Sequence, residues 1–254
     1  MARGHTHALY RHGDSALHRL PAHVKVVAAL VMVLAIVATP RHAVWLFAAH
    51  AVVLVSAAAM ARLGVRFVLG RMLIEVPFLL AALGLPALGP EPRIEVLGVG
   101  LSVEGLWALF NIAAKATLGL LTSIVLAGTT EVTDLLAAFD RLRMPRVMTA
   151  IMGFMVRYAD VVAGEFTRMR TAMRSRGHEA RWIGQLGPMA RGIGGLFIRT
   201  YERGERVYLA MASRGYSGSM PVAVSSPAPV STWVAALAVP AAAWALVAVE
   251  WWGR

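Results

Sequence analysis

Residues 103–127 read VEGLWALFNIAAKATLGLLTSIVLA, an apolar run in which only Glu104 and Lys115 carry a charge. A helix that crosses a bilayer needs about 20 mainly apolar residues, so this run is long enough to span a membrane. Four other stretches meet the same requirement, and they lie at residues 24–39, 43–62, 67–88 and 231–252. The sequence therefore predicts an all-α integral membrane protein with about five transmembrane helices.

The composition of the chain supports the same class. Hydrophobic residues make up 58% of the 254 residues and charged residues only 15%, whereas charged residues form about 25% of an ordinary soluble domain. The chain contains no cysteine, which excludes a disulfide framework, a cysteine-based metal site and a thiol nucleophile.

The positions of the arginines predict the orientation of the chain. If the N-terminus is cytoplasmic, the basic residues before the first span, those at 62–71 and those of the long polar segment 129–220 all lie inside, as the positive-inside rule requires. Only Arg41, Arg93 and Arg254 are left outside. We therefore expect a multi-pass protein of the bacterial plasma (inner) membrane whose C-terminus lies outside.

The net charge of +11 is then mainly a consequence of topology. We expect the lipid bilayer as a partner and no nucleic acid, because the basic residues lack a lysine-rich or base-stacking pattern. Only two of the basic residues are lysines, Lys25 and Lys115.

Three segments follow from this topology. Residues 1–128 hold an N-terminal cytoplasmic segment and four transmembrane helices, residues 129–220 form a cytoplasmic region, and residues 221–254 hold a linker and the final transmembrane helix. Periodic apolar residues in the cytoplasmic region predict one helix over about 145–176 and a second over about 188–214.

The same short motif stands at the end of both predicted cytoplasmic helices. Residues 172–178 read Ala-Met-Arg-Ser-Arg-Gly-His, and residues 210–216 read Ala-Met-Ala-Ser-Arg-Gly-Tyr. The glycine is a natural helix end, and an arginine there is stabilised by the helix dipole by about 0.3–1 kcal/mol. Capping therefore explains either arginine alone. Two arginines in matching contexts favour a further role, since a planar guanidinium suits anchoring in an acidic or carbonyl-lined groove of another protein. The candidate site comprises Arg176, Arg214, Ser175, Gly177, Ser213 and Gly215.

Methionine is concentrated in the same region, and methionine side chains adapt to irregular binding surfaces. One interpretation makes these residues the core between the two helices, and the other makes them a surface that docks partner helices. The candidates for partner contact are Met155, Met169, Met173 and Met211.

At these residues the chain resembles the transmembrane (T) component of energy-coupling factor (ECF) transporters, and in particular the cobalt-type CbiQ family. Members of that family carry two x-Arg-x motifs at the ends of two cytoplasmic coupling helices, which correspond here to Ser175-Arg176-Gly177 and Ser213-Arg214-Gly215. The resemblance also runs through residues 14–25, 141–146 and 201–211. The chain departs from the family in having serine where alanine is commoner before each arginine.

The resemblance implies a non-catalytic scaffold. Two ABC-type ATPase subunits would be held through Arg176 and Arg214, and a separate substrate-binding (S) membrane subunit would carry the cargo, for which cobalt is expected. No cofactor is implied for this chain, because ATP and Mg²⁺ would be bound by the ATPase subunits. The sequence agrees in lacking a Gly-x4-Gly-Lys-Ser/Thr phosphate-binding loop.

Other functions compete with this interpretation. A T component for nickel or biotin has a similar design, and an ordinary ABC importer permease would show several polar side chains along its spans. A membrane enzyme acting on lipid phosphates would need a nucleophile and an acid–base or metal set near the arginines. We expect no metal site in this chain, because the spans contain no cysteine and few acids or histidines.

Two of the few charges inside the predicted spans are Glu75 and Lys115. Intramembrane charges are candidates for a transport site. The favoured alternatives are a buried Glu75–Lys115 ion pair that joins the third and fourth spans, or side chains that extend to the headgroups.

Overall fold

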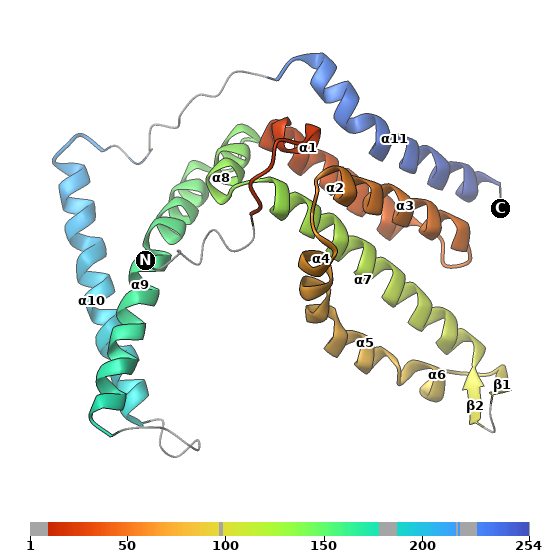
Figure 1. Cartoon of the computed structure of the whole chain (residues 1–254), viewed down its shortest axis with the longest axis horizontal. Coiled ribbons are helices and arrows are strands. Elements are labelled where there is room, and N and C mark those ends of the chain that lie inside the picture. The colour runs from red at the N-terminus through yellow and green to blue at the C-terminus, as the bar shows by residue number, and fades with distance from the viewer. Residues whose placement is uncertain (1–9, 97–98, 178–186, 217, 219–227, 254) are drawn as a thin grey trace. The chain divides into compact units, whose positions relative to one another are not determined.

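The computed structural model describes residues 10–96, 99–177, 187–216, 218 and 228–253 (Figure 1). The chain divides into two compact units, which are described separately. One unit comprises Met1–Ala8 and Phe139–Val224, and the other comprises Leu9–Ala138 and Ser225–Arg254.

The second unit, here called the membrane unit, contains the five predicted spans. Its helices are α1 (Ala16–Arg19), α2 (Ala22–Ala38), α3 (Val44–Met60), α4 (Val65–Met72), the 3-10 turn η2 (Leu73–Glu75), α5 (Val76–Ala82), α6 (Leu85–Leu88), α7 (Val103–Thr129) and α11 (Val230–Trp252). The division between the units falls inside α8 (Val132–Arg141). The other unit, here called the hairpin unit, contains α9 (Arg146–Ser175) and α10 (Gly187–Ala212).

The helices confirm the predicted all-α membrane class. The segment Val65–Leu88 and helices α7 and α11 are long and apolar enough to cross a bilayer, and α2 and α3 are shorter apolar helices. Helix α9, which lies in the predicted cytoplasmic region, is also long and apolar enough over part of its length to cross a bilayer.

The third predicted span is not one continuous helix. Residues 65–88 form α4, η2, α5 and α6 in succession, and Pro77 and Pro86 stand in the first turns of α5 and α6 (Figure 1). Proline has no backbone N–H and is favoured at the start of a helix rather than in its interior. The two prolines therefore divide the apolar run into short helices.

A small hairpin interrupts the otherwise helical membrane unit. Strands β1 (Arg93–Val96) and β2 (Val99–Ser102) are antiparallel, with Arg93 opposite Ser102. Ser102 also begins α7, because its hydroxyl accepts a hydrogen bond of 3.1 Å from the backbone N–H of Gly105, a typical N-cap. The β1–β2 hairpin thus ends directly at the start of α7, the longest helix of the membrane unit.

The core of the membrane unit lies between α2, α3, α7 and α11. Its buried residues are Met32, Ala35, Ile36, Phe47, Leu54, Leu118, Leu121 and Ala243. Helices α2 and α11 are joined by two long-range hydrogen bonds, from Trp244 Nε1 to Val31 O and from Trp251 Nε1 to Ala38 O, both 3.0 Å. Because donors and acceptors have the same spacing along the two helices, α2 and α11 lie parallel and in register.

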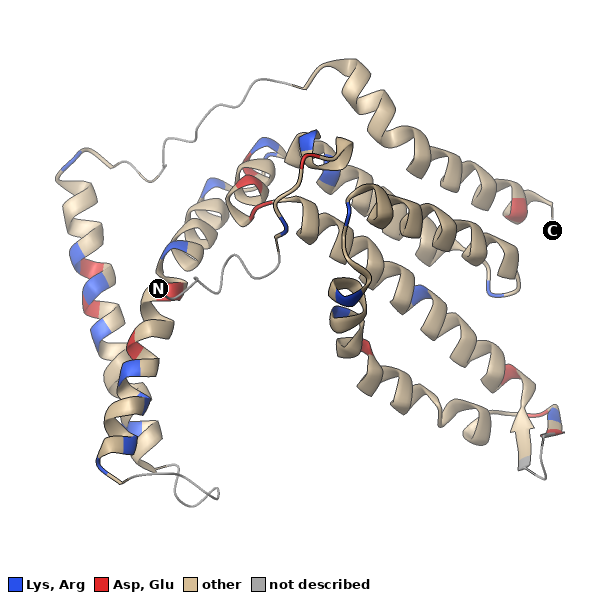
Figure 2. Cartoon of the chain, in the orientation of Figure 1, with Lys and Arg blue, Asp and Glu red and all other residues tan. Residues whose placement is uncertain are grey.

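The hairpin unit is built from two antiparallel helices. Glu165 of α9 forms an ion pair with Arg203 of α10 at 2.5 Å. Farther along, a Cβ on Gly192 of α10 would lie 2.6 Å from Met169 Sδ of α9, so glycine permits the close approach. Figure 2 shows charged residues along both of these helices, whereas α3 carries none and α11 carries few.

Candidate functional site

The two Ser-Arg-Gly motifs end their helices in the same backbone conformation. Gly177 has φ +75° and Gly215 has φ +83°, the left-handed region in which a glycine ends a helix without steric cost. The glycine N–H groups donate to Arg174 O at 2.9 Å and to Ala212 O at 3.0 Å, which are equivalent positions. The repeat in sequence is therefore a repeat in structure.

The serine hydroxyls are also equivalent. Ser175 Oγ donates to Ala172 O and Ser213 Oγ donates to Ala210 O, both at 3.0 Å. Each serine thus bonds the last turn of its own helix and leaves the following arginine free to project. The serine hydroxyls therefore bond within their own helices at both ends.

Both arginines are solvent-exposed. Neither guanidinium forms an ion pair or a side-chain hydrogen bond with any residue in the described parts of the chain. The arginines lie at opposite ends of the hairpin, because Arg176 lies beside the start of α10 and Arg214 follows its end. The rise of an α-helix puts the two ends roughly 38 Å apart.

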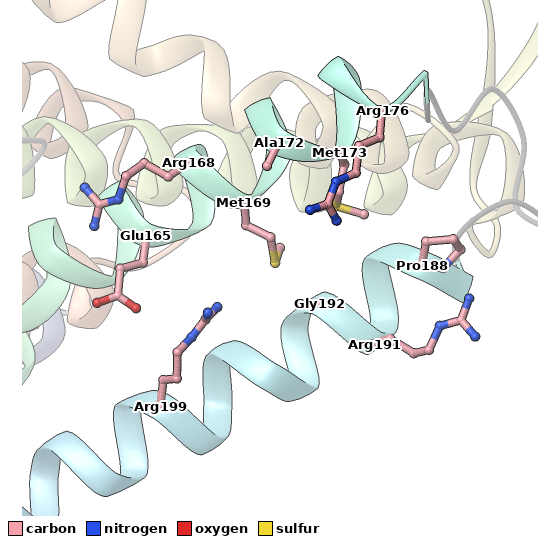
Figure 3. Close-up of a pocket in the computed structure, with 10 residues that line it drawn as sticks. All are labelled: Glu165, Arg168, Met169, Ala172, Met173, Arg176, Pro188, Arg191, Gly192 and Arg199. Carbon is pink, nitrogen blue, oxygen red and sulfur yellow. The ribbon is translucent and has the colours of Figure 1, made fainter.

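A cavity of about 750 Å³ lies between α9 and α10 next to Arg176 (Figure 3). Figure 3 shows Arg176 of α9 and Arg199 of α10 directed into the space between the two helices. The lining residues are Glu165, Arg168, Met169, Ala172, Met173, Arg176, Pro188, Arg191, Gly192 and Arg199. Four arginines against one glutamate make this space strongly basic.

Sequence reasoning missed three arginines of this cavity: Arg168, Arg191 and Arg199. A signal for them exists in the spacing, because Arg168 precedes Arg176 by about two helical turns, and Arg191 precedes Arg199 by the same interval. Recognising the cluster also requires the antiparallel register of the two helices, which the sequence does not state.

The methionines proposed for partner contact lie in different surroundings. Met169 and Met173 line the cavity between the helices, Met155 is 67% exposed, and Met211 is half-buried. Met169 and Met173 therefore lie between the two helices but are only half-buried. The exposed Met155 is free to contact another surface.

Glu75 and Lys115 do not form the ion pair considered from the sequence. Lys115 Nζ donates to Val37 O at 2.8 Å, a carbonyl in the last turn of α2 that lacks a partner within its helix. Glu75 Oε1 accepts from Thr117 Oγ1 at 2.8 Å. Lys115 and Thr117 lie about 200° apart around α7, so the face of α7 that meets Glu75 is opposite the face that carries the lysine.

Potential metal ligands are dispersed among the described residues, where no group of three histidine, cysteine or acidic side chains is arranged to hold an ion. His5 and His7 lie outside the described residues. Among the described residues, the cavity lining contains no serine, cysteine or histidine beside the arginines.

Comparison with known proteins matches most of the chain to a family of transport proteins. Residues 13–223 match the family of cobalt transport proteins called CbiQ. A cobalt transport protein CbiQ of Rhodobacter capsulatus is 30% identical over 173 residues, which cover 66% of this chain and 67% of the relative. A putative fused cobalt transport protein CbiMQ of Methanocorpusculum labreanum is 27% identical over 158 residues, which cover 58% of this chain but only 26% of the relative. The chain thus spans about a quarter of the fused relative.

Proposed function

Because this chain belongs to the CbiQ family of cobalt transport proteins, we propose that it is the transmembrane component of an ECF transporter. In this role it couples ATP hydrolysis by two ATPase subunits to movement of a substrate-binding membrane subunit. ATP and Mg²⁺ are bound by the ATPase subunits, and this chain is not an enzyme.

The observation that carries the proposal is the pair of equivalent helix ends. Each end presents one exposed arginine immediately before a glycine in the left-handed conformation, and the two arginines are roughly 38 Å apart. Two identical anchors far apart suit two copies of a partner better than one small ligand. A guanidinium that has no intramolecular partner among the described residues is available for an acidic or carbonyl-lined groove in each ATPase.

The hairpin is also suited to transmitting movement. The Glu165–Arg203 ion pair joins α9 to α10 about midway between the two motifs, and the glutamate side chain is only 13% exposed. Close packing at Gly192 adds a second connection. A displacement of either arginine is therefore carried along both helices.

Cobalt is the proposed cargo because both relatives described above are named as cobalt transport proteins. Cargo selection is assigned to the substrate-binding subunit, since a Co²⁺ site needs several converging ligands. Nickel or biotin cargo leaves the coupling role unchanged.

In the proposed topology the N-terminus and the hairpin unit are cytoplasmic, and the C-terminus lies outside the bacterial inner membrane. Helix α9 stays outside the bilayer in spite of its apolar half, because Glu165, Arg168 and Arg170 lie in its other half and the helix packs against the charged helix α10.

The proposal is tested by co-expressing the tagged chain with its ATPase and substrate-binding subunits. Loss of a charged interface anchor costs about 2–5 kcal/mol, so the Arg176→Ala/Arg214→Ala variant is expected to recover far less ATPase and to lose cobalt uptake. Arg206→Ala is the matched control, since Arg206 is an exposed arginine of α10 that makes only a 3.8 Å pair with Glu202. Normal uptake and ATPase recovery in the double variant rule out the assigned anchors.

A further inference from the structure

A second cavity, of about 330 Å³, lies inside the membrane unit between α2, α3, α7 and α11. Nearly all of its lining is aliphatic, and the few polar groups include Lys25 and Thr129 at one end. The cavity lies apart from the hairpin unit and is not used by the coupling role proposed above.

The cavity occupies one leaflet. It is bounded by residues 25–32 of α2, 53–60 of α3, 122–129 of α7 and 235–240 of α11. Eight residues of helix extend over about 11 Å, which is about a third of the 30 Å hydrocarbon core. In the proposed topology this is the cytoplasmic half of the membrane.

The floor of the cavity is buried and its rim is open. Met32 and Thr122 on the floor are 3% and 5% exposed, whereas Met60 of α3 and Val239 of α11 on the rim are 58% and 49% exposed. The cavity therefore opens sideways between α3 and α11. In a bilayer that side faces acyl chains rather than water.

Lys25 gives the cavity a buried positive charge. Its side chain is 8% exposed, and Nζ donates one hydrogen bond of 2.7 Å to Thr129 O. No described carboxylate lies within ion-pair distance of it, and Asp134 of α8 acts on its charge only from a longer distance. An ammonium group has three donors, and a buried charge is costly unless it is compensated. An anion at this end of the cavity would supply the missing partner.

The segment before α2 contains a second basic residue near the cavity in sequence. Leu17 and Leu20 line the cavity, and Arg19 between them in sequence is exposed. The aliphatic interior of the cavity suits an acyl chain, and its basic end suits an anionic headgroup. Basic residues near a membrane surface attract acidic lipids. We propose that this cavity binds one acidic phospholipid, with an acyl chain inside and the phosphate near Lys25 and Arg19.

A helix of a partner protein fits the cavity less well. A helix with side chains is about 10 Å across, so an 11 Å length of it occupies roughly 800 Å³. This exceeds the cavity of about 330 Å³ more than twofold, whereas a single acyl chain is narrow enough to enter.

The test is native mass spectrometry of the delipidated full chain with phosphatidylglycerol or phosphatidylcholine added. The wild type is expected to retain one phosphatidylglycerol, with at least a fivefold preference over phosphatidylcholine. Lys25→Met should abolish this preference. Lys115→Met is the matched control, because Lys115 also donates to a neighbouring helix carbonyl within a span but does not line the cavity, and it should behave as wild type.

Variants that fill the cavity test whether an acyl chain enters it, independently of the headgroup contact at Lys25. Ala57→Leu and Ala236→Leu place larger side chains on two walls, and each should lower phosphatidylglycerol retention at least fivefold. Size-exclusion chromatography and circular dichroism identify a variant that fails to fold, and the other variant then decides. Unchanged lipid retention in a folded, filled variant overturns the proposal. Unchanged lipid retention together with loss of another transporter subunit would instead identify a protein as the occupant.

Discussion

Thr117 of α7 donates a hydrogen bond of 2.8 Å to the buried carboxylate of Glu75. This bond connects the divided span of α4–α6 to the long helix α7 inside the membrane unit. Lys115, two residues away, faces another helix and bonds Val37 O. The two intramembrane charges therefore serve two separate helix contacts.

The separation of these contacts predicts how their mutations combine. Glu75→Ala and Lys115→Ala should add to within about 0.5 kcal/mol, because the side chains share no partner. Glu75→Ala and Thr117→Ala should not add, since each removes the same hydrogen bond, and a hydrogen bond to a charged group is worth about 1.5–3 kcal/mol. Thermal unfolding of the purified chain in detergent measures both cycles. Strong coupling between positions 75 and 115 would contradict the observed partners.

The glycine turns should be needed at both helix ends. Gly177→Ala and Gly215→Ala place a Cβ in the left-handed region, which costs about 1–2 kcal/mol, and asparagine should be tolerated better than alanine. Uptake and ATPase recovery should fall in the order glycine, asparagine, alanine. Gly153→Ala is the control, because Gly153 lies within α9 with free space around it and alanine favours helix there. Equal effects at positions 153 and 177 would show that the turn has no special role.

Loss of the ion pair between α9 and α10 should reduce cobalt uptake without reducing the binding of the ATPase subunits. Arg203→Ala leaves Arg176 and Arg214 in place but removes the bond to Glu165. ATPase recovery is therefore expected to stay near wild type while cobalt uptake falls severalfold. Arg206→Ala, which breaks only an exposed pair of small energetic value, should leave both quantities unchanged. Full uptake by Arg203→Ala would mean that the hairpin transmits movement without this bond.

Because half of α9 is apolar, the number of helices that cross the bilayer should be measured. With five spans and a cytoplasmic N-terminus, a reporter active only in the cytoplasm should work after Tyr216 and fail after the last residue. If α9 crossed the bilayer as a sixth span, both results would be reversed. The same two fusions therefore decide the position of the hairpin unit.

The two indole contacts of α11 should contribute to stability in similar amounts. Trp244→Phe and Trp251→Phe keep a ring in place but remove the N–H donors to α2. Each loss is expected to cost about 0.5–1.5 kcal/mol in thermal unfolding. Trp252→Phe is the control, because Trp252 is 93% exposed and should have no measurable effect.

Hydropathy was sufficient to predict the all-α membrane class, and helices occupy all five of the predicted apolar runs. The number of helices that cross the bilayer remains a prediction. The Ser-Arg-Gly repeat likewise predicted where α9 and α10 end, since the conformation of a glycine turn is local. The coupling role of Arg176 and Arg214 remains a prediction.

Features that depend on how helices face one another could not be predicted from the sequence. The partner of Glu75 is decided by rotation of α7 about its axis, and Lys115 and Thr117 are too close in sequence for hydropathy to distinguish their faces. The arginine cavity depends on the antiparallel register of α9 and α10. The division of the third span follows from Pro77 and Pro86, which were visible in the sequence, but a proline within an apolar run can also produce only a kink.

The parallel pairing of α2 with α11 has a mechanical consequence. The first and last spans belong to one body, so the chain leaves that body before α9 and returns to it after α10. Both ends of the hairpin unit's helical segment are thus connected by the chain to the same unit. The returning helix α11 begins at Val230, beyond residue 223, where the match to the family ends. Removing α11 would leave the hairpin unit connected to the membrane unit only through α8, so we expect a chain without α11 to lose coupling while it keeps both Ser-Arg-Gly motifs.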